Sequence, residues 1–304
     1  MTKRKLSEYS GSKGEPSSSP KTSSEANNKP KESQSETSID AKAFKELSTP
    51  KGIGNPSLEG VKIPEDGKAY FNQVGPQQVK LDSEELKKMN IFFATPCYGG
   101  MVTDQYFLSM FKLSQAMIQN GINFRITTLR NESLVTRARN ILTAMFMADE
   151  SATHLMFIDA DIEFEADSVL RMLAMNKNIT AAAYPKKTVD WGGVSRAVER
   201  KEEDPATFGA EYAINLKFEN RETKKVASSD GAVEVLDAST GFFIVKKEVV
   251  KAMFEAYPDL FYKNDSSIDP KFNKYCYSLF DTIHDPKDNR YLSEDYTFCR
   301  RWQA

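Results

Sequence analysis

The sequence predicts an α/β protein with a mainly parallel central sheet, preceded by a segment of different composition. From Asn90 onward, short apolar segments of strand length alternate with amphipathic segments of helix length, joined by short links. This alternation is typical of parallel strands whose crossover helices pack on the sheet. We therefore expect one Rossmann-like domain over residues 86–304 and a separate region over residues 1–85.

Residues 1–85 are predicted to be a disordered tail and linker. The first 40 residues contain 11 serines and only four large apolar residues, Met1, Leu6, Tyr9 and Ile39. Such a segment cannot bury enough apolar surface to offset its ordering entropy. Prolines and glycines then interrupt residues 41–85. The alternative is an arm that docks a partner protein.

The elements of the domain follow from hydrophobic periodicity. Its first helix, 103–119, places Phe107, Met110, Phe111, Ser114 and Met117 on one predicted apolar face. In the second helix, 132–149, Asn131 is a plausible N-cap and Leu134, Ala138, Leu142 and Met145 share a face. The predicted elements are strand 90–95, helix 103–119, strand 122–128, helix 132–149, strand 154–160, helix 166–176, strand 179–185, two strands and a helix within 234–254, and a helix from Ser293.

Composition narrows the classes of function. The chain has 43 acidic and 41 basic residues, so its net charge of −2 gives no indication of a nucleic-acid polymer as partner. No apolar run approaches the ~18 residues that span a bilayer, and the N-terminus lacks the apolar core of a secretory signal. Three scattered cysteines without a CxxC pair suit a reducing compartment. We expect a cytoplasmic protein without membrane insertion.

The apolar segment 154–158 ends in two acidic residues, Asp159 and Asp161, with only Ala160 between them. A carboxylate at a buried strand needs a partner or water. In α/β sheets ligands bind beyond the carboxyl ends of the strands, and residues i and i+2 of a strand share a face. The pattern predicts a hard divalent cation, Mn²⁺ or Mg²⁺, shared with a diphosphate. The alternative is an exposed strand end in an acidic run that continues through Glu163.

Two arginines in the second helix, Arg137 and Arg139, are candidates for contact with a phosphate. Arg139 shares its face with Leu142, and a guanidinium in an apolar setting needs an anion. That anion is Asp159, a ligand phosphate or a purely structural carboxylate.

Glu294 and Asp295 follow Ser293, where a helix is predicted to begin. The helix dipole favours ionised carboxylates in a first turn, which would keep a general base deprotonated. The alternative is that these acids do no more than start the helix.

Several other residues are candidates for substrate contact. The segment 237–243 interrupts an apolar stretch with polar residues and a glycine, which allows close approach of a ligand, although a tight turn or bulge explains it equally well. The loop after Pro185 could offer charge and a stacking face to a sugar or phosphate, or be a solvated loop. The aromatic residue in the turn after the first strand could stack on a base or simply pack. These candidates are Asp237, Thr240, Gly241, Lys186, Trp191 and Tyr98.

Taken in order, six motifs resemble a GT-A-fold glycosyltransferase, most closely the stand-alone nucleotide-sugar transferases of phages and large viruses. The resemblance covers about residues 90–304. The motifs are "ATPCYGG", "SLVTRARN", "MFIDADIEF", "AAYPKKTVDW", "STGFFIVKKEV" and "YLSEDYTFCRRW".

The resemblance implies roles for individual residues. Asp159 and Asp161 would match the DxD motif that holds Mn²⁺ or Mg²⁺ and the donor diphosphate, with Ala160 and Arg139 near the donor. Pro96, Cys97 and Tyr98 would meet the nucleotide base. Asp295 would be the general base of an inverting enzyme, and Glu294 its neighbour. Thr240 and Gly241 would line the cleft for sugar and acceptor.

The resemblance also implies partners and leaves alternatives. A nucleotide-sugar donor and a hydroxyl acceptor on a glycan, protein or other molecule are expected, in the host cytoplasm if the protein is viral. Such enzymes often take a third metal ligand from beyond the last helix, and this chain stops at Ala304, so we expect a truncated domain. The alternatives are a carbohydrate-binding or assembly protein without catalysis, and a phosphatase with a DxD motif.

Overall fold

The computed structural model describes residues 83–220, 225–229, 231–266, 268–286 and 289–304. The predicted tail therefore lies almost entirely outside the described residues. The helices are α2 (Ser83–Lys87), α3 (Asp104–Gln119), α4 (Val135–Ala148), α5 (Ala166–Ala174), α6 (Trp191–Glu199), α7 (Lys247–Ala256) and α8 (Glu294–Gln303), with short 3-10 helices at Tyr98–Gly100, Pro205–Gly209, Pro258–Leu260 and Pro270–Tyr275. Among the described residues, no helix combines the length and apolar character needed to span a bilayer.

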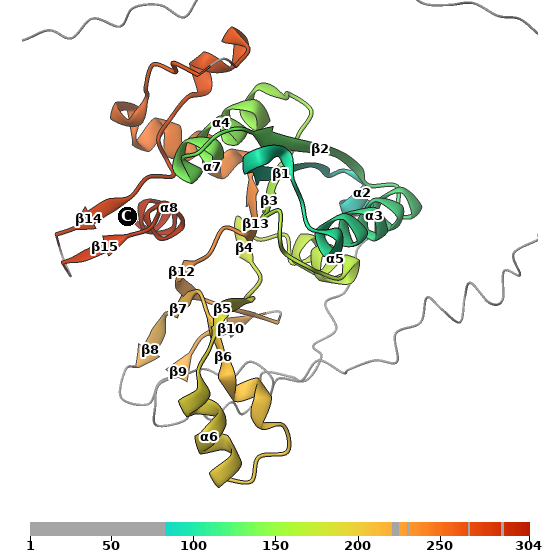
Figure 1. Ribbon diagram of the computed structural model, residues 1–304. Coiled ribbons are helices and arrows are strands. Elements are labelled where there is room, and N and C mark those ends of the chain that lie inside the picture. Colours follow the sequence, from blue (N-terminus) through green and yellow to red (C-terminus); the bar gives the residue numbers. More distant parts are fainter. Residues whose placement is uncertain (1–82, 221–224, 230, 267, 287–288) are drawn as a thin grey trace, which may run out of the picture. The chain divides into compact units, whose positions relative to one another are not determined.

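The centre of the domain is a five-stranded sheet in the order β2-β1-β3-β13-β4 (Figure 1). Strands β2 and β3 both run parallel to β1, whereas β13 lies antiparallel between β3 and β4. The sheet is thus mainly parallel, as predicted from the strand–helix alternation. Its strands are β1 (Asn90–Cys97), β2 (Asn123–Arg130), β3 (His154–Ile158), β4 (Ile179–Ala181) and β13 (Phe242–Lys246).

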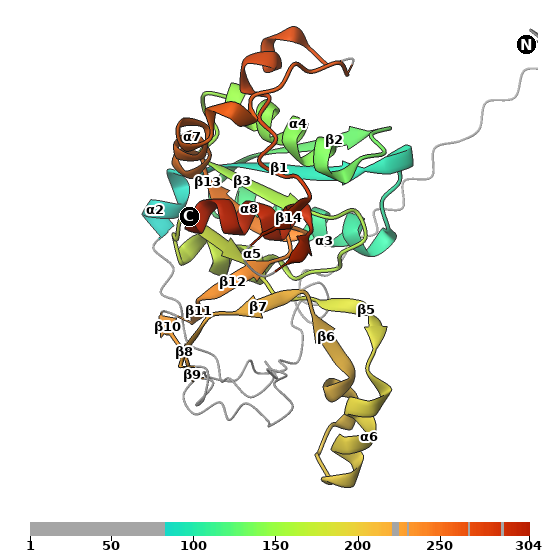
Figure 2. The ribbon, with the colours of Figure 1, turned by 90° about the vertical axis from the view of Figure 1, so that its left-hand side faces the viewer.

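Smaller two-stranded sheets lie outside this core. One pairs β5 with β6 and carries α6, and another pairs β12 with β7 and leads into β13 (Figure 2). The remaining strands are β5 (Pro185–Val189), β6 (Ala210–Tyr212), β7 (Ile214–Leu216), β8 (Phe218–Asn220), β9 (Lys225–Val226), β10 (Ser228–Ser229), β11 (Ala232–Val233), β12 (Val235–Ala238), β14 (Ile283–Asp285) and β15 (Arg290–Leu292).

Helices cover both faces of the central sheet because alternate strand residues point to opposite sides. On one face, Phe93 and Ile244 join a core with residues of α3 and α5. On the other, Phe92 and Phe243 join a core with α4, α7 and α8. Burial of large apolar side chains on both faces explains why β1, β3 and β13 are apolar along most of their length.

Helix α8 is held against the sheet by aromatic packing. The fully buried ring of Phe298 stacks on Phe280 with centroids 4.4 Å apart and meets Phe243 edge-on at 5.7 Å. This packing brings the start of α8 to the same part of the domain as the residues that follow β3.

Two details of the predicted helices were wrong. In α3 the buried side chains include Tyr106, Met110, Leu113 and Met117, whereas Phe107 and Phe111 are 60% and 55% exposed, because the sheet lies against the neighbouring stripe. Helix α4 begins later than predicted.

The N-cap position of α4 is Leu134. The predicted cap, Asn131, instead adopts φ of +60° in the connection from β2, a conformation that asparagine tolerates better than most residues. Leu134 is therefore largely exposed, while Ala138 and Leu142 are buried as predicted.

Candidate functional site

Several of the predicted site residues meet beyond the carboxyl end of β3, namely Arg139, Asp159, Gly241 and Glu294. The strand ends at Ile158, two residues earlier than predicted. Asp159 therefore lies with Asp161 in the turn after the strand, whereas we had expected it within the strand. Strand β13 is antiparallel to β3, so Gly241, the residue before β13, lies beside Asp159. The amide of Asp159 donates to the carbonyl of Gly241 at 2.9 Å. The carbonyl of Ala160 accepts from the Thr103 amide at 2.9 Å, which ties the turn to the start of α3.

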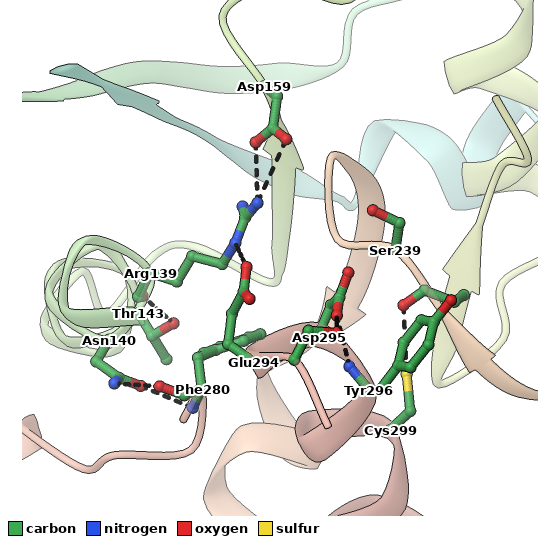
Figure 3. Close-up of polar contacts among 12 residues, drawn as sticks. Arg139, Asn140, Thr143, Asp159, Ser239, Phe280, Glu294, Asp295, Tyr296 and Cys299 are labelled. Atoms are coloured by element: carbon green, nitrogen blue, oxygen red, sulfur yellow. Dashed lines mark hydrogen bonds and ion pairs between the residues drawn. The ribbon is translucent and has the colours of Figure 1, made fainter. Parts of the chain in front are cut away.

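Arg139 is the centre of the site. Its Nη2 donates to Asp159 Oδ1 and Oδ2 at 3.0 and 3.4 Å, and its Nε donates to Glu294 Oε1 at 3.2 Å. Figure 3 shows the two carboxylates approaching the guanidinium from different sides. The side chain of Arg139 is only 4% exposed and lies over the ring of Phe157.

The two carboxylates keep Arg139 charged. Burial by itself lowers the pKa of Arg139, but the charges and hydrogen bonds of Asp159 and Glu294 outweigh it, so the net shift is upward. The Nη1 atom of Arg139 is buried and has no hydrogen-bond partner among the described residues. A buried guanidinium with two carboxylates leaves this cluster one negative charge in excess.

Asp161 has a different environment from Asp159. It forms an ion pair with Lys187 on β5, whose side chain is 86% exposed. The hydrogen bond to Asp161 raises the pKa of Lys187. Exposed pairs of this kind contribute little to stability, so a ligand can displace the lysine at small cost.

Asp159 and Asp161 could hold a divalent cation only if a substrate supplied the rest of its ligands. Within the described ranges, no group of three or more His, Cys, Asp and Glu side chains is placed to enclose a metal ion. Mg²⁺ is commonly held by one or two carboxylates together with substrate phosphates and water. Asp161, which is exposed, and Asp159, which is partly buried, are the carboxylates that could hold such a cation.

Asp295 lies at the start of α8, directly after Glu294. Its Oδ1 accepts from the Tyr296 amide at 2.8 Å and from the Ser293 hydroxyl. Ser293 occupies the N-cap position, as predicted. Its hydroxyl donates to Asp295, however, and forms no capping hydrogen bond with a backbone amide of the helix. Both acids are partly buried, but Glu294 pairs with Arg139, whereas Asp295 accepts from two neighbouring groups of its own helix start.

Tyr184, which we did not single out from the sequence, also belongs to the site. It follows β4, and its hydroxyl lies 2.5 Å from Ser239 Oγ. Burial raises its pKa, an effect opposed by the hydrogen bond to Ser239 and reinforced by the charges of Asp159 and Asp295. No signal in the sequence pointed to it, because Tyr184 fell inside the predicted strand 179–185, whereas β4 ends at Ala181.

Asp237 does not line a cleft, in contrast to our expectation. Its side chain is fully buried and accepts from Arg300 Nη2 at 2.9 Å and from Asn215 Nδ2 at 2.8 Å. We reassign it as the residue that anchors α8 to β12. Thr240 is also fully buried, and its hydroxyl has no hydrogen-bond partner within the described part of the chain.

The other candidates lie around the site or point away from it. Arg137 pairs with Glu132 at 2.7 Å. Lys186 lies 3.7 Å from Glu211, so Lys187 and not Lys186 adjoins the acidic turn.

The aromatic candidates are exposed. Tyr98, after β1, is 72% exposed, and Trp191, at the start of α6, is 75% exposed. Pro96 is partly buried within β1, opposite Leu129 of β2. No contact joins either aromatic ring to the acidic cluster in the described residues, so their predicted roles in base and sugar binding stay predictions.

The chain was compared with known proteins. No protein-family model and no curated protein matches it. A crystal structure of A197 from STIV is 19% identical with a TM-score of 0.31, and the match covers 54% of this chain and 67% of that one. The 4-diphosphocytidyl-2C-methyl-D-erythritol synthase from Anaerococcus prevotii DSM 20548 is 13% identical with a TM-score of 0.30, over 72% of this chain and 98% of that one. Likenesses this distant identify neither a family nor an activity for this chain.

Proposed function

We propose that this protein is a glycosyltransferase that moves a sugar from a nucleotide-diphospho-sugar to an acceptor hydroxyl. The observation that supports this most is the double ion pair of Arg139, which joins the acidic turn after β3 to the acidic start of α8. The transfer needs a diphosphate site and a base close to each other, and the two acidic segments are at least 133 positions apart in the sequence. Their meeting at one arginine is what the proposed chemistry requires.

The two carboxylate groups have different roles in this proposal. Asp159 and Asp161 hold the diphosphate of the donor with Mn²⁺ or Mg²⁺, which when bound neutralises the leaving group as a Lewis acid. Arg139 positions Asp159 through its ion pair and offsets part of the negative charge of Asp159 and Glu294. The negative charge that remains on this cluster favours the binding of a divalent cation.

Asp295 is the proposed general base. It accepts the proton of the acceptor hydroxyl as that oxygen bonds to the anomeric carbon, and the bond from this carbon to the diphosphate oxygen breaks. The nucleoside diphosphate leaves, and the anomeric configuration inverts. The hydrogen bonds from Ser293 and the Tyr296 amide orient the carboxylate for this step.

The phosphatase alternative is disfavoured by the position of the motif in the domain. It requires the motif near the start of the domain, usually followed by Gly and Thr or Val, whereas here two strand–helix units precede Asp159 and Ile162 and Glu163 follow Asp161. A sugar-binding protein without catalysis shares the site and differs only in the role of Asp295.

Ligand-dependent thermal stability of the full chain tests the proposal. We expect one nucleoside diphosphate from a panel to raise Tm in the presence of Mn²⁺, since a ligand at 100 times its Kd adds about 2.7 kcal/mol. Asp161→Ala should abolish the rise without lowering the unliganded Tm, because its ion pair with Lys187 is exposed.

Glu163→Ala is the matched control. Glu163 is an exposed acid two residues further along the same run, and we expect this variant to behave as the wild type. A wild-type protein that no nucleotide stabilises, with or without Mn²⁺, contradicts the proposed function.

A further inference from the structure

Tyr184 and Ser239 form a coupled hydroxyl pair at the floor of the site. Tyr184 comes from the segment after β4 and Ser239 from the turn between β12 and β13, and their oxygens are 2.5 Å apart. The backbone of Gly241 lies directly against them. A Cβ atom at Gly241 would overlap the Tyr184 hydroxyl and lie 2.7 Å from Asp159 Oδ2. The Tyr184 hydroxyl and the Asp159 carboxylate therefore lie on the same side of Gly241, close to its Cα atom.

The pair has hydrogen-bonding capacity to spare. Two hydroxyl groups carry two protons, of which the bond between them uses one, and lone pairs remain on both oxygens. The raised pKa of Tyr184, caused first by burial, keeps the phenol protonated and neutral. The pair can therefore both donate to and accept from a ligand.

The charges nearby decide which kind of ligand suits it. Asp159 and Asp295 act on Tyr184 electrostatically, and Arg139 opposes them. Because Arg139 is already paired with two carboxylates, the surroundings of Tyr184 are negative overall and would repel a further anion. A neutral group that both donates and accepts, such as a sugar hydroxyl, fits this position better than a phosphate oxygen, which only accepts.

We propose that Tyr184 and Ser239 bind a hydroxyl of the transferred sugar and so help to determine which sugar the enzyme accepts. The inference rests on the proposed function and adds the sugar subsite to it. It places the sugar over Gly241, between the Asp159 carboxylate and the start of α8, where Asp295 can reach an incoming acceptor.

Calorimetric titration of the full chain tests the inference, with Mn²⁺ present and with UDP, UDP-glucose, GDP and GDP-mannose as probes. Tyr184→Phe removes only the hydroxyl and Ser239→Ala removes its partner. We expect both variants to bind the nucleotide sugar about three- to tenfold more weakly than the wild type, as for the loss of one neutral hydrogen bond, and to bind the nucleoside diphosphate with unchanged affinity. Tyr277→Phe, a tyrosine whose ring stacks on Phe254 of α7, is the control.

The outcomes separate the inference from the function on which it rests. Equal affinities of wild type and variants for every nucleotide sugar that binds, or equal losses for sugar and diphosphate, overturn the sugar subsite while the proposed function stands. A wild-type protein that binds none of the four probes overturns both. Thermal unfolding of each variant shows whether it is folded, and if Tyr184→Phe is unfolded the comparison rests on Ser239→Ala.

Discussion

The guanidinium of Arg139 binds the carboxylate of Glu294 at 3.2 Å, although 155 positions separate the two residues in the sequence. This bond and the one to Asp159 join three segments, the helix α4, the turn after β3 and the start of α8. A mutation of Arg139 should therefore affect both the stability of the fold and the geometry of the site.

Replacement of Arg139 by leucine should lower the free energy of unfolding by about 3 kcal/mol, because it leaves two largely buried carboxylates without their partner. Urea denaturation of the full chain measures this effect. The double variant Arg139→Leu/Glu294→Leu should recover part of the loss, since it removes one of the stranded charges.

Arg137→Leu is the control for this experiment. Arg137 lies two residues away in the same helix, and its side chain is 37% exposed, whereas that of Arg139 is 4% exposed. We expect the Arg137 variant to lose clearly less free energy of unfolding than the Arg139 variant. An Arg139 variant as stable as the Arg137 variant would show that the ion pairs of Arg139 do not hold α8.

Asp295→Asn should lower the turnover of the donor by about 10²–10⁴-fold, the range of a positioned general base. The amide keeps the size of the side chain and can still accept from the Tyr296 amide, so ligand-induced stabilisation by nucleoside diphosphate and Mn²⁺ should persist. Release of nucleoside diphosphate from the nucleotide sugar, with and without a trial acceptor, measures turnover. A variant with unchanged turnover would favour the binding or assembly protein.

Gly241→Ala should destabilise the site by about 1–3 kcal/mol, the usual cost of overpacking. The added methyl group would overlap the Tyr184 hydroxyl and crowd Asp159. Combining it with Tyr184→Ala, which makes room, should restore part of the stability. Urea denaturation measures both.

Gly192→Ala is the matched control, because the nearest atoms there belong to the flexible side chains of Arg196 and Asp190 at 3.2 and 3.3 Å. Gly192 lies in α6, where alanine is favoured over glycine. The Gly241 argument fails if both alanine variants are equally stable.

Stability should depend on pH because of one buried histidine, His154. His154 is buried at the start of β3, and its pKa is lowered from 6.5 to about 4, first by burial and then by the charge of Lys246. Below pH 6.5 the unfolded chain binds a proton that the folded protein does not, so stability is lost as pH falls from 6.5 toward 4. The loss should be on the order of 2–3 kcal/mol at pH 4.

His154→Leu should reduce this dependence between pH 7 and 4.5, measured by urea denaturation at each pH. His284→Gln is the control, since His284 is exposed. If His154→Leu and the wild type lose stability in parallel, His154 does not control the acid sensitivity.

Much of the fold was predictable because its signals are local. The apolar residues of β1 and β3 and the periodicity of α3, α4 and α5 are short-range patterns, and each is read within one element. The errors within elements have a tertiary cause. Phe107 and Phe111 satisfied the helical period of α3, but the sheet packs on the stripe that contains Tyr106 and Leu113.

The candidate site was predictable as a set of residue types and not as a geometry. The sequence showed acids after β3 and at the start of α8, but the partners of these acids come from distant segments. Asp159 was one of three anions expected to pair with Arg139, and the structure confirms that pair. Nothing local indicates that Glu294 shares Arg139, that Asp237 is buried against Arg300, or that Tyr184 meets Ser239.

The sequence by itself determined the order of strands and helices, the mainly parallel sheet and the two acidic segments, because hydrophobic period and helix-start chemistry act within a few residues. The tertiary structure alone decided which acid is buried and which is accessible. It did so because the stability of a buried charge depends on partners that the folding of the whole domain brings to it, as Arg139 is brought to Asp159 and Glu294.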